Sequence, residues 1–151
     1  MPTVTEVLSD AADAILGSAT DMLERAGLPH YDKAGPAAGR ERLGQLFSLV
    51  QTTVESRDLV PMIDHANRIA HERFEAGFDI HEVQRAFSVL EEAIWTQVIA
   101  DVPPEGLAEA LGLVGTALGA GRDALACTYV SLATHQHVPT LDLSALFRGG
   151  R

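Results

Sequence analysis

Apolar residues recur at intervals of three and four along most of this chain, which is the spacing of one face of an α-helix. No stretch of useful length alternates apolar and polar residues in the manner of a β-strand. The pattern predicts five main helices, over residues 3–26, 40–56, 59–76, 80–102 and 107–132. We therefore expect an all-α fold in which residues 1–151 form one helical bundle, with a long C-terminal helix and a tail at 138–151. The pattern does not distinguish a globin-like bundle from an ordinary antiparallel one.

Residues typical of helix ends support these boundaries. Thr3 with Glu6 has the spacing of a capping box, and Gly27 and Pro29 are expected to end the first helix. The glycines and prolines of LPHYDKAGPAAG, residues 28–39, predict a loop, and Asp58 is the expected N-cap of the third helix. Within HERFEAGFDIHEVQRAFSVLEEAIW, residues 71–95, Gly77 fits a C-cap and Asp79 with Glu82 fits a second capping box. This stretch is therefore predicted to be a corner between two packed helices.

The last predicted helix carries unusually many small residues. One stripe with spacings of four and three comprises Leu107, Leu111, Val114, Leu118, Gly121, Leu125, Thr128 and Leu132. A small-residue stripe lies beside it, and its candidate members for a seam between two copies are Ala110, Gly115, Ala117, Gly119 and Ala124. At ~1.5 Å per residue this helix would span ~39 Å and overhang its shorter neighbours. We expect either a central helix of the bundle or, with slight preference, the seam of a homodimer.

The charge of the chain argues against polyanionic partners. Eleven basic and 21 acidic residues give a net charge of −10, and no basic run offsets it. We expect no binding to nucleic acid or to anionic lipid. The longest uncharged run, 110–121, is shorter than the ~20 residues of a membrane span, and no secretory signal is recognisable. A cytoplasmic protein is the expectation, with the single cysteine, Cys127, as a small buried residue.

None of the six histidines forms a convincing metal site. His65 and His71 are six residues apart, on different faces of one helix, and HERFE lacks the second histidine of a zinc-protease motif. His135 and His137 supply only two ligands, whereas a structural zinc site needs four. Haem held by a histidine would require an apolar pocket, and the neighbours of His65 and His71 are charged. We therefore predict no metal and no cofactor, and solvent-facing histidines.

The sequence also offers no catalytic residue. The acid pairs Glu72–Glu75 and Glu91–Glu92 lie on faces predicted to be wet, and neither a GxSxG turn nor a GxxxxGK[ST] loop occurs. The glycines of the last helix have no preceding strand to build a phosphate cradle. An enzyme is therefore not expected. The candidates for contact with a partner or ligand are His30 and Tyr31 in the loop, Arg68 and His71 on the third helix, and Trp95 beside the apolar stripe of the fourth.

Residues 66–98 resemble a known family. The run ANRIAHERFEAGFDIHEVQRAFSVLEEAIWTQV is similar to the N-terminal domain of RsbRD-type RsbT co-antagonist proteins and to input domains of PucR-type regulators. The resemblance rests on Ile69–Ala70, Arg73, Gly77, Ile80, Ala86–Phe87 and Ile94–Trp95, and LPHY upstream is a shorter echo of the pattern. It implies an all-α sensory or regulatory domain of bacterial stress signalling, which dimerises and passes a signal to an output domain.

The function expected from this resemblance is non-enzymatic signal transduction through contact with a protein partner. The alternative is a sensor that binds a small molecule, haem or a metal near His71 or the loop at 28–36. After His137 there is no room for an output domain, so the chain is expected either to act alone or to be part of a longer protein.

Overall fold

The computed structural model describes residues 2–137, and this part of the chain forms helices without any β-strand. The helices are α1 (Val4–Asp10), α2 (Ala12–Arg25), α3 (Pro29–Ala34), α4 (Pro36–Ser56), α5 (Val60–Glu75), α6 (Ile80–Asp101) and α7 (Pro104–His137). The predicted all-α bundle with a long C-terminal helix is confirmed. The expected tail at 138–151 lies outside the described residues.

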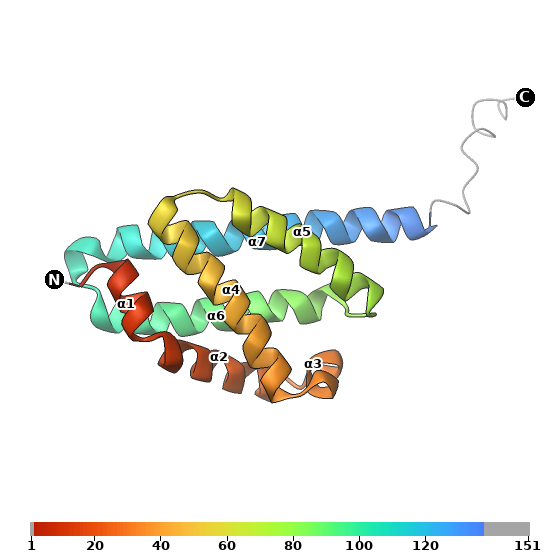
Figure 1. Cartoon of the computed structure of the whole chain (residues 1–151), viewed down its shortest axis with the longest axis horizontal. Helices are drawn as coiled ribbons and strands as arrows, with labels where there is room; N and C mark the ends of the chain where they lie inside the picture. The colour runs from red at the N-terminus through yellow and green to blue at the C-terminus, as the bar shows by residue number, and fades with distance from the viewer. Residues whose placement is uncertain (1, 138–151) are drawn as a thin grey trace, which may run out of the picture.

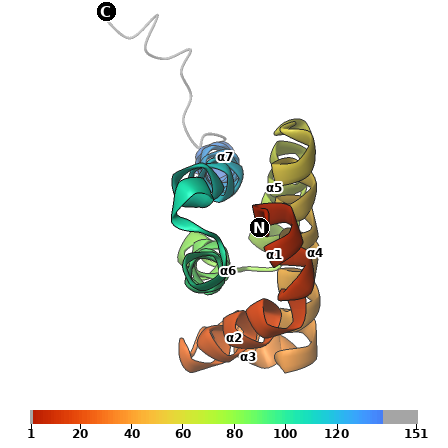
Figure 2. The ribbon, with the colours of Figure 1, turned by 90° about the vertical axis from the view of Figure 1, so that its left-hand side faces the viewer.

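The helices form two layers that enclose the core. Helices α6 and α7 run antiparallel in one layer, and α4 and α5 form the other, crossing the first pair obliquely (Figures 1 and 2). Helix α2 packs against α4 and α6 and closes one edge, where α3 also contacts α4. The largest fully buried side chains, from six of the helices, are Phe87, Leu8, Ile15, Leu43, Met62, Leu90, Ile94, Leu118 and Leu125. Burial of one such side chain stabilises the fold by roughly 1.5–3 kcal/mol.

The prediction of a single helix over residues 3–26 is wrong, because this stretch forms two helices, α1 and α2. The capping box of Thr3 and Glu6 is present, but α1 ends at Asp10 and Ala11 leaves the helical conformation with φ −100° and ψ 12°. Both short helices pack against α4 and α6, and the bend between them follows that surface (Figure 1). The bend thus allows Leu8 and Ile15 both to be fully buried. An apolar stripe alone does not reveal it.

The predicted loop at 28–39 is also wrong. Pro29 begins α3 and Pro36 begins α4, and Gly35 between them has φ 92°. Proline is tolerated in the first turn of a helix, because the backbone N–H that it lacks has no partner there. The two prolines therefore start helices here instead of ending them.

The corner between α5 and α6 forms as predicted. Gly77 has φ 86°, which glycine adopts without a steric penalty, and Asp79 with Glu82 makes the second capping box. The predicted N-cap of α5 is wrong by one residue, because Leu59 and not Asp58 is the N-cap. Asp58 Oδ1 still accepts a hydrogen bond from the backbone N–H of Val60. Both features orient the chain where it enters a helix.

Helix α7 is longer than expected and extends past α5 and α6 at its C-terminal end (Figure 1). Four members of its predicted stripe, Val114, Leu118, Gly121 and Leu125, are buried. A Cβ atom at Gly121 would lie 2.7 Å from Phe87 Cε1 on α6 and 3.0 Å from Met62 Sδ on α5. Gly121 is therefore a point at which α7 lies too close to both neighbours to accommodate a Cβ atom without a shift.

Candidate functional site

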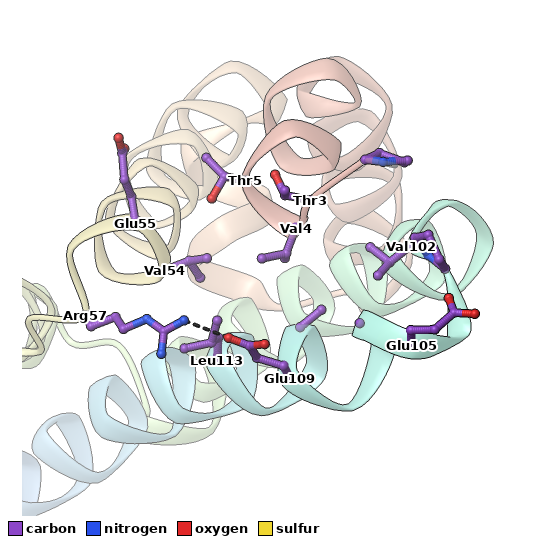
Figure 3. Close-up of a pocket in the computed structure, with 14 residues that line it drawn as sticks. Thr3, Val4, Thr5, Val54, Glu55, Arg57, Val102, Glu105, Glu109 and Leu113 are labelled. Carbon is purple, nitrogen blue, oxygen red and sulfur yellow. Dashed lines mark hydrogen bonds and ion pairs between the residues drawn. The ribbon is translucent and has the colours of Figure 1, made fainter.

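Polar residues gather at the two ends of the bundle. One group surrounds the turn between α5 and α6, and we call it the corner: His30, Tyr31, Phe78, Asp79 and Glu82. The other lines a cavity at the opposite end, between the start of α1, the end of α4 and the α6–α7 turn, and we call it the cleft (Figures 1 and 3).

Glu82 is the centre of the corner. It is buried, and its Oε1 accepts a hydrogen bond from the backbone N–H of His30 at 2.9 Å. Its Oε2 accepts from the backbone N–H of Asp79 at 3.0 Å and lies 2.7 Å from His30 Nδ1. Burial alone would raise the pKa of Glu82, but the hydrogen bonds from His30 and Asp79 outweigh it and lower the pKa. The carboxylate thus joins α3 to the start of α6.

The ring of Phe78 is surrounded by polar side chains. His30 stacks 4.8 Å from it, Tyr31 meets it edge-on at 5.2 Å, and the guanidinium groups of Arg42 and Arg73 lie 5.4 and 5.7 Å from its centroid. Cations are attracted to the face of an aromatic ring over such distances. Helices α3, α4 and α5 therefore meet around one residue of the turn.

Tyr129 connects α7 to the same turn. Its hydroxyl donates a hydrogen bond to the carbonyl oxygen of Phe78 at 3.1 Å, and its ring meets Phe74 edge-on. Burial raises the pKa of Tyr129 to about 12, so the phenol stays protonated and donates. Every polar contact of the corner described above thus joins parts of the fold to one another, which is the arrangement of a structural joint.

The cleft is different, because it is a hollow of about 510 Å³. Its lining includes the buried residues Val54, Val102 and Ala110. Val4 and Leu113 line it as well (Figure 3). Its volume lies within the range of small-molecule sites, which is roughly 300–1,000 Å³. The segments that build it lie far apart in the sequence, which is why the helical pattern did not predict it.

Charged residues surround the cleft. Glu55, Glu105 and Glu109 contribute carboxylates, and Arg57 Nη2 lies 2.7 Å from Glu109 Oε1 (Figure 3). Arg57 caps α4 in the left-handed conformation with φ 58° and ψ 30°, which is uncommon for a residue other than glycine. One arginine against three glutamates makes the rim acidic, so the cleft favours a cationic or neutral occupant.

Comparison with known proteins matches this chain to one family model. The family model of the RsbT co-antagonist protein rsbRD N-terminal domain matches residues 5–137. The chain belongs to this family. No curated protein and no solved structure gives a significant match. The family match covers nearly all the described residues, well beyond the resemblance noted at 66–98, and it makes this member of the rsbRD N-terminal family a regulatory domain of stress-response signalling.

The predicted contact residues of this rsbRD N-terminal domain are not brought together. His30 and Tyr31 lie in the corner, where Tyr31 is buried. Arg68 is exposed on α5 and pairs with Glu72, and His71 is exposed further along that helix beside an open hollow with Asn67 and Cys127. Trp95 is 41% exposed on α6. These residues do not form one site.

Two expectations about single residues are wrong. His65 was expected to face solvent, but it is buried, and its Nδ1 lies 2.8 Å from Arg68 Nη2. Cys127 was expected to be buried, but it is exposed. Cys127 follows an apolar run, yet it lies on the outer face of α7, two positions along from Leu125, which is buried. Whether a residue of a helix is buried depends on which neighbouring helices cover its face, and the sequence of that helix does not specify them.

The small residues of α7 divide between two faces. Ala110 and Ala117 are buried inside the domain, at 2% and 0% exposure. Gly115 and Gly119 are partly exposed, and a Cβ atom added at either would meet nothing within 4 Å. Ala124 is partly buried and packs against the core. The predicted set is therefore not one continuous stripe on the surface of this rsbRD N-terminal domain.

Within the residues that the structure describes, no group of three or more histidine, cysteine, aspartate or glutamate side chains is arranged to hold a metal ion. None of their helices is both long and apolar enough to cross a membrane. The sequence did not indicate Phe78 or Arg42 as members of a site, and it singled out Arg73 only through the family resemblance, since only the fold brings the three together. It had found Glu82 through the capping-box spacing alone.

Proposed function

We propose that this domain is a non-enzymatic regulatory module, which forms a homodimer and passes a signal through contact with a protein partner. The outer face of α7 is the observation that carries the proposal. Gly112, Gly115 and Gly119 have open space beyond them, so a second helix could approach the backbone closely. Each helical glycine costs roughly 1 kcal/mol of helix propensity relative to alanine. Close approach of another helix would offset that cost.

Exposed apolar side chains support an interface on the same layer. Val130 on α7 is 63% exposed, and Trp95 and Ile99 on the neighbouring α6 are 41% and 56% exposed. Tryptophan is enriched among the residues that dominate binding energy at interfaces. The C-terminal turns of α7, which extend past α5 and α6, add surface that this domain does not cover (Figure 1).

The charge of the chain restricts the partner. A net charge of −10 disfavours nucleic acid and anionic lipid, so a protein with a basic or neutral surface fits best. We propose the bacterial cytoplasm as the place where this contact is made, which fits a stress-response family.

Light scattering tests the dimer. We expect the wild-type chain to be a dimer at micromolar concentration and Gly119→Leu to be a folded monomer, because leucine fills the space needed for close approach. Gly44→Leu is the matched control, since Gly44 is a helical glycine on α4 that also has nothing within 4 Å of its Cβ position. Ala117→Leu is unsuitable, because Ala117 is in the core. A wild-type monomer, or a Gly119→Leu dimer, contradicts the proposed seam.

The cleft favours a second candidate function, the sensing of a small molecule. Its apolar floor and acidic rim fit an amphipathic amine, with the alkyl chain against Val54 and Val102 and the ammonium group near Glu105 or Glu109. Octylamine should raise the melting temperature of the wild-type chain more than that of Glu105→Gln/Glu109→Gln, with octanol as the neutral control. Equal shifts in both chains contradict this function. A purified sample with no visible absorption band and no metal in elemental analysis would exclude haem and metal sensing.

A further inference from the structure

The side of α7 that points away from α5 carries one continuous stripe of exposed or partly exposed residues, which we call the outer stripe. No other helix of residues 2–137 covers this side (Figure 2). The members of the outer stripe recur at intervals of three and four, which places them on one face of the helix. They are Ala108, Gly112, Gly115, Gly119, Asp123, Ala126 and Val130. At ~1.5 Å per residue the outer stripe spans ~33 Å.

The two halves of the outer stripe differ in side-chain size. The half before Gly119 consists of an alanine and two glycines, and a Cβ atom added at either glycine would meet nothing within 4 Å. The half after Gly119 holds larger side chains and ends at Val130, which is 63% exposed. In a parallel pair of α7 helices, every residue would face its own copy. Glycine would then face glycine at one end and valine would face valine at the other, so the two helices would diverge.

An antiparallel pair centred on Gly119 fits the outer stripe better. Each small residue of one copy then faces a larger residue of the other. The facing pairs are Gly115 with Asp123, Gly112 with Ala126, and Ala108 with Val130. Because small residues meet larger ones at every level, the separation of the two helices stays even along the whole stripe, and even packing maximises the contacts made.

The charges along α7 favour the same orientation. Glu105 and Glu109 are exposed near its start and Asp123 is exposed further on, whereas residues 124–134 include no charged side chain. A parallel pair would set each of these acids beside its own copy, and like charges placed together across an interface disfavour it. An antiparallel pair centred on Gly119 sets Glu105 and Glu109 against the uncharged segment of the other copy.

We propose that two copies of this domain pack their α7 helices antiparallel, with Gly119 of both copies at the twofold axis. The inference rests on the homodimer proposed above and adds its orientation and register. Asp123 of each copy then lies level with the exposed Thr116 of the other, whose hydroxyl can donate a hydrogen bond to the carboxylate. The cleft of each copy, which Glu105 and Glu109 line, adjoins the C-terminal turns of α7 in the other copy.

Disulfide cross-linking tests the orientation. Cys127 is the single cysteine of the chain and is exposed, so the test uses the Cys127→Ser background. A disulfide requires Cα atoms less than ~7 Å apart. We expect Gly115→Cys and Asp123→Cys to form a cross-linked dimer only when the two chains are co-expressed, and neither chain to cross-link with itself. A chain that cross-links with itself would overturn the antiparallel orientation and leave the homodimer standing.

Spin labels at Val130→Cys, in the same background, give a distance that does not depend on disulfide formation. Two labels should lie roughly 30–40 Å apart in the antiparallel pair, because each is ~16 Å along the helix from Gly119. In a parallel pair, with helix axes about 8–10 Å apart, they would lie within about 20 Å. The shorter distance, or a dimer without any cross-link between the co-expressed chains, would overturn the inference alone. A monomer in light scattering would overturn it together with the proposed homodimer.

Discussion

Glu82 and Glu109 lie at opposite ends of the same bundle and have opposite surroundings. The Glu82 side chain, in the corner, is 5% exposed and accepts hydrogen bonds from His30 and Asp79, whereas the Glu109 side chain, at the cleft, is 65% exposed and pairs with Arg57. The corner commits its polar atoms to holding α3, α6 and α7 together. The cleft leaves them in solvent around a hollow. The corner is therefore built for stability, and the cleft has charge available for a ligand.

The largest difference should appear when each carboxylate is neutralised. Glu82→Gln places an NH₂ group against a backbone N–H donor, and leaving a buried donor unpaired should lower the free energy of unfolding by about 2–3 kcal/mol. Urea unfolding at neutral pH measures this loss. Glu92→Gln, at an exposed position of the same helix, is the control and should change little. A loss below about 0.5 kcal/mol would remove the distinction between the ends.

The pH dependence sharpens the same prediction. The pKa of Glu82 is lowered in the folded state, so its contribution is present above the unfolded value of 4.5 and is lost as the pH falls through the lowered pKa. Wild-type stability should therefore decline below pH 4.5, and the decline should be shallower in Glu82→Gln. Parallel acid curves would contradict the role of the carboxylate.

The dependence of stability on alkaline pH tests the contribution of Tyr129. Its pKa of about 12 exceeds the unfolded value of 10.0, so the stability it contributes is complete below pH 10 and is lost between about pH 10 and 12. Tyr129→Phe should lower the free energy of unfolding at pH 7 by about 1 kcal/mol, because the Phe78 carbonyl loses its donor, and should flatten the alkaline decline. Chemical unfolding from pH 7 to 12 measures both. An alkaline curve unchanged by the substitution would contradict the prediction.

At the cleft, replacing a charged residue should raise the free energy of unfolding instead of lowering it. Arg57 occupies a left-handed conformation that costs a residue with a Cβ atom about 1 kcal/mol, and glycine avoids this cost. The exposed ion pair that is lost contributes little. We expect Arg57→Gly to raise the free energy of unfolding by about 0.5–1 kcal/mol. A destabilised variant would show that the cleft end, like the corner, depends on its polar contacts.

The smallest effect is expected for Glu109→Gln, within about 0.5 kcal/mol in urea unfolding, because exposed ion pairs are worth little. The same variant at low salt should also change little. A loss of about 2 kcal/mol would place the Arg57–Glu109 pair among the structural contacts and break the comparison.

Local chemistry made much of the fold predictable. Gly77 and the Asp79–Glu82 capping box depend on residues a few positions apart, so their geometry could be read from the chain. The tertiary contacts of the corner could not be predicted in this way, because His30 and Glu82 are 52 residues apart in sequence. Ala11 carries no helix-breaking chemistry, and the bend there reflects the surface on which α1 and α2 pack.

The sequence by itself determined the helical class, the corner at Gly77 and the acidic character of the surface, since these follow from helical periodicity, local capping and composition. Tertiary packing decided that His65 and Ala117 are buried, that Cys127 is exposed, and that Arg42 and Arg73 both lie near the ring of Phe78. Helical spacing shows which residues share a face, and only the packing of neighbouring helices determines which face is covered.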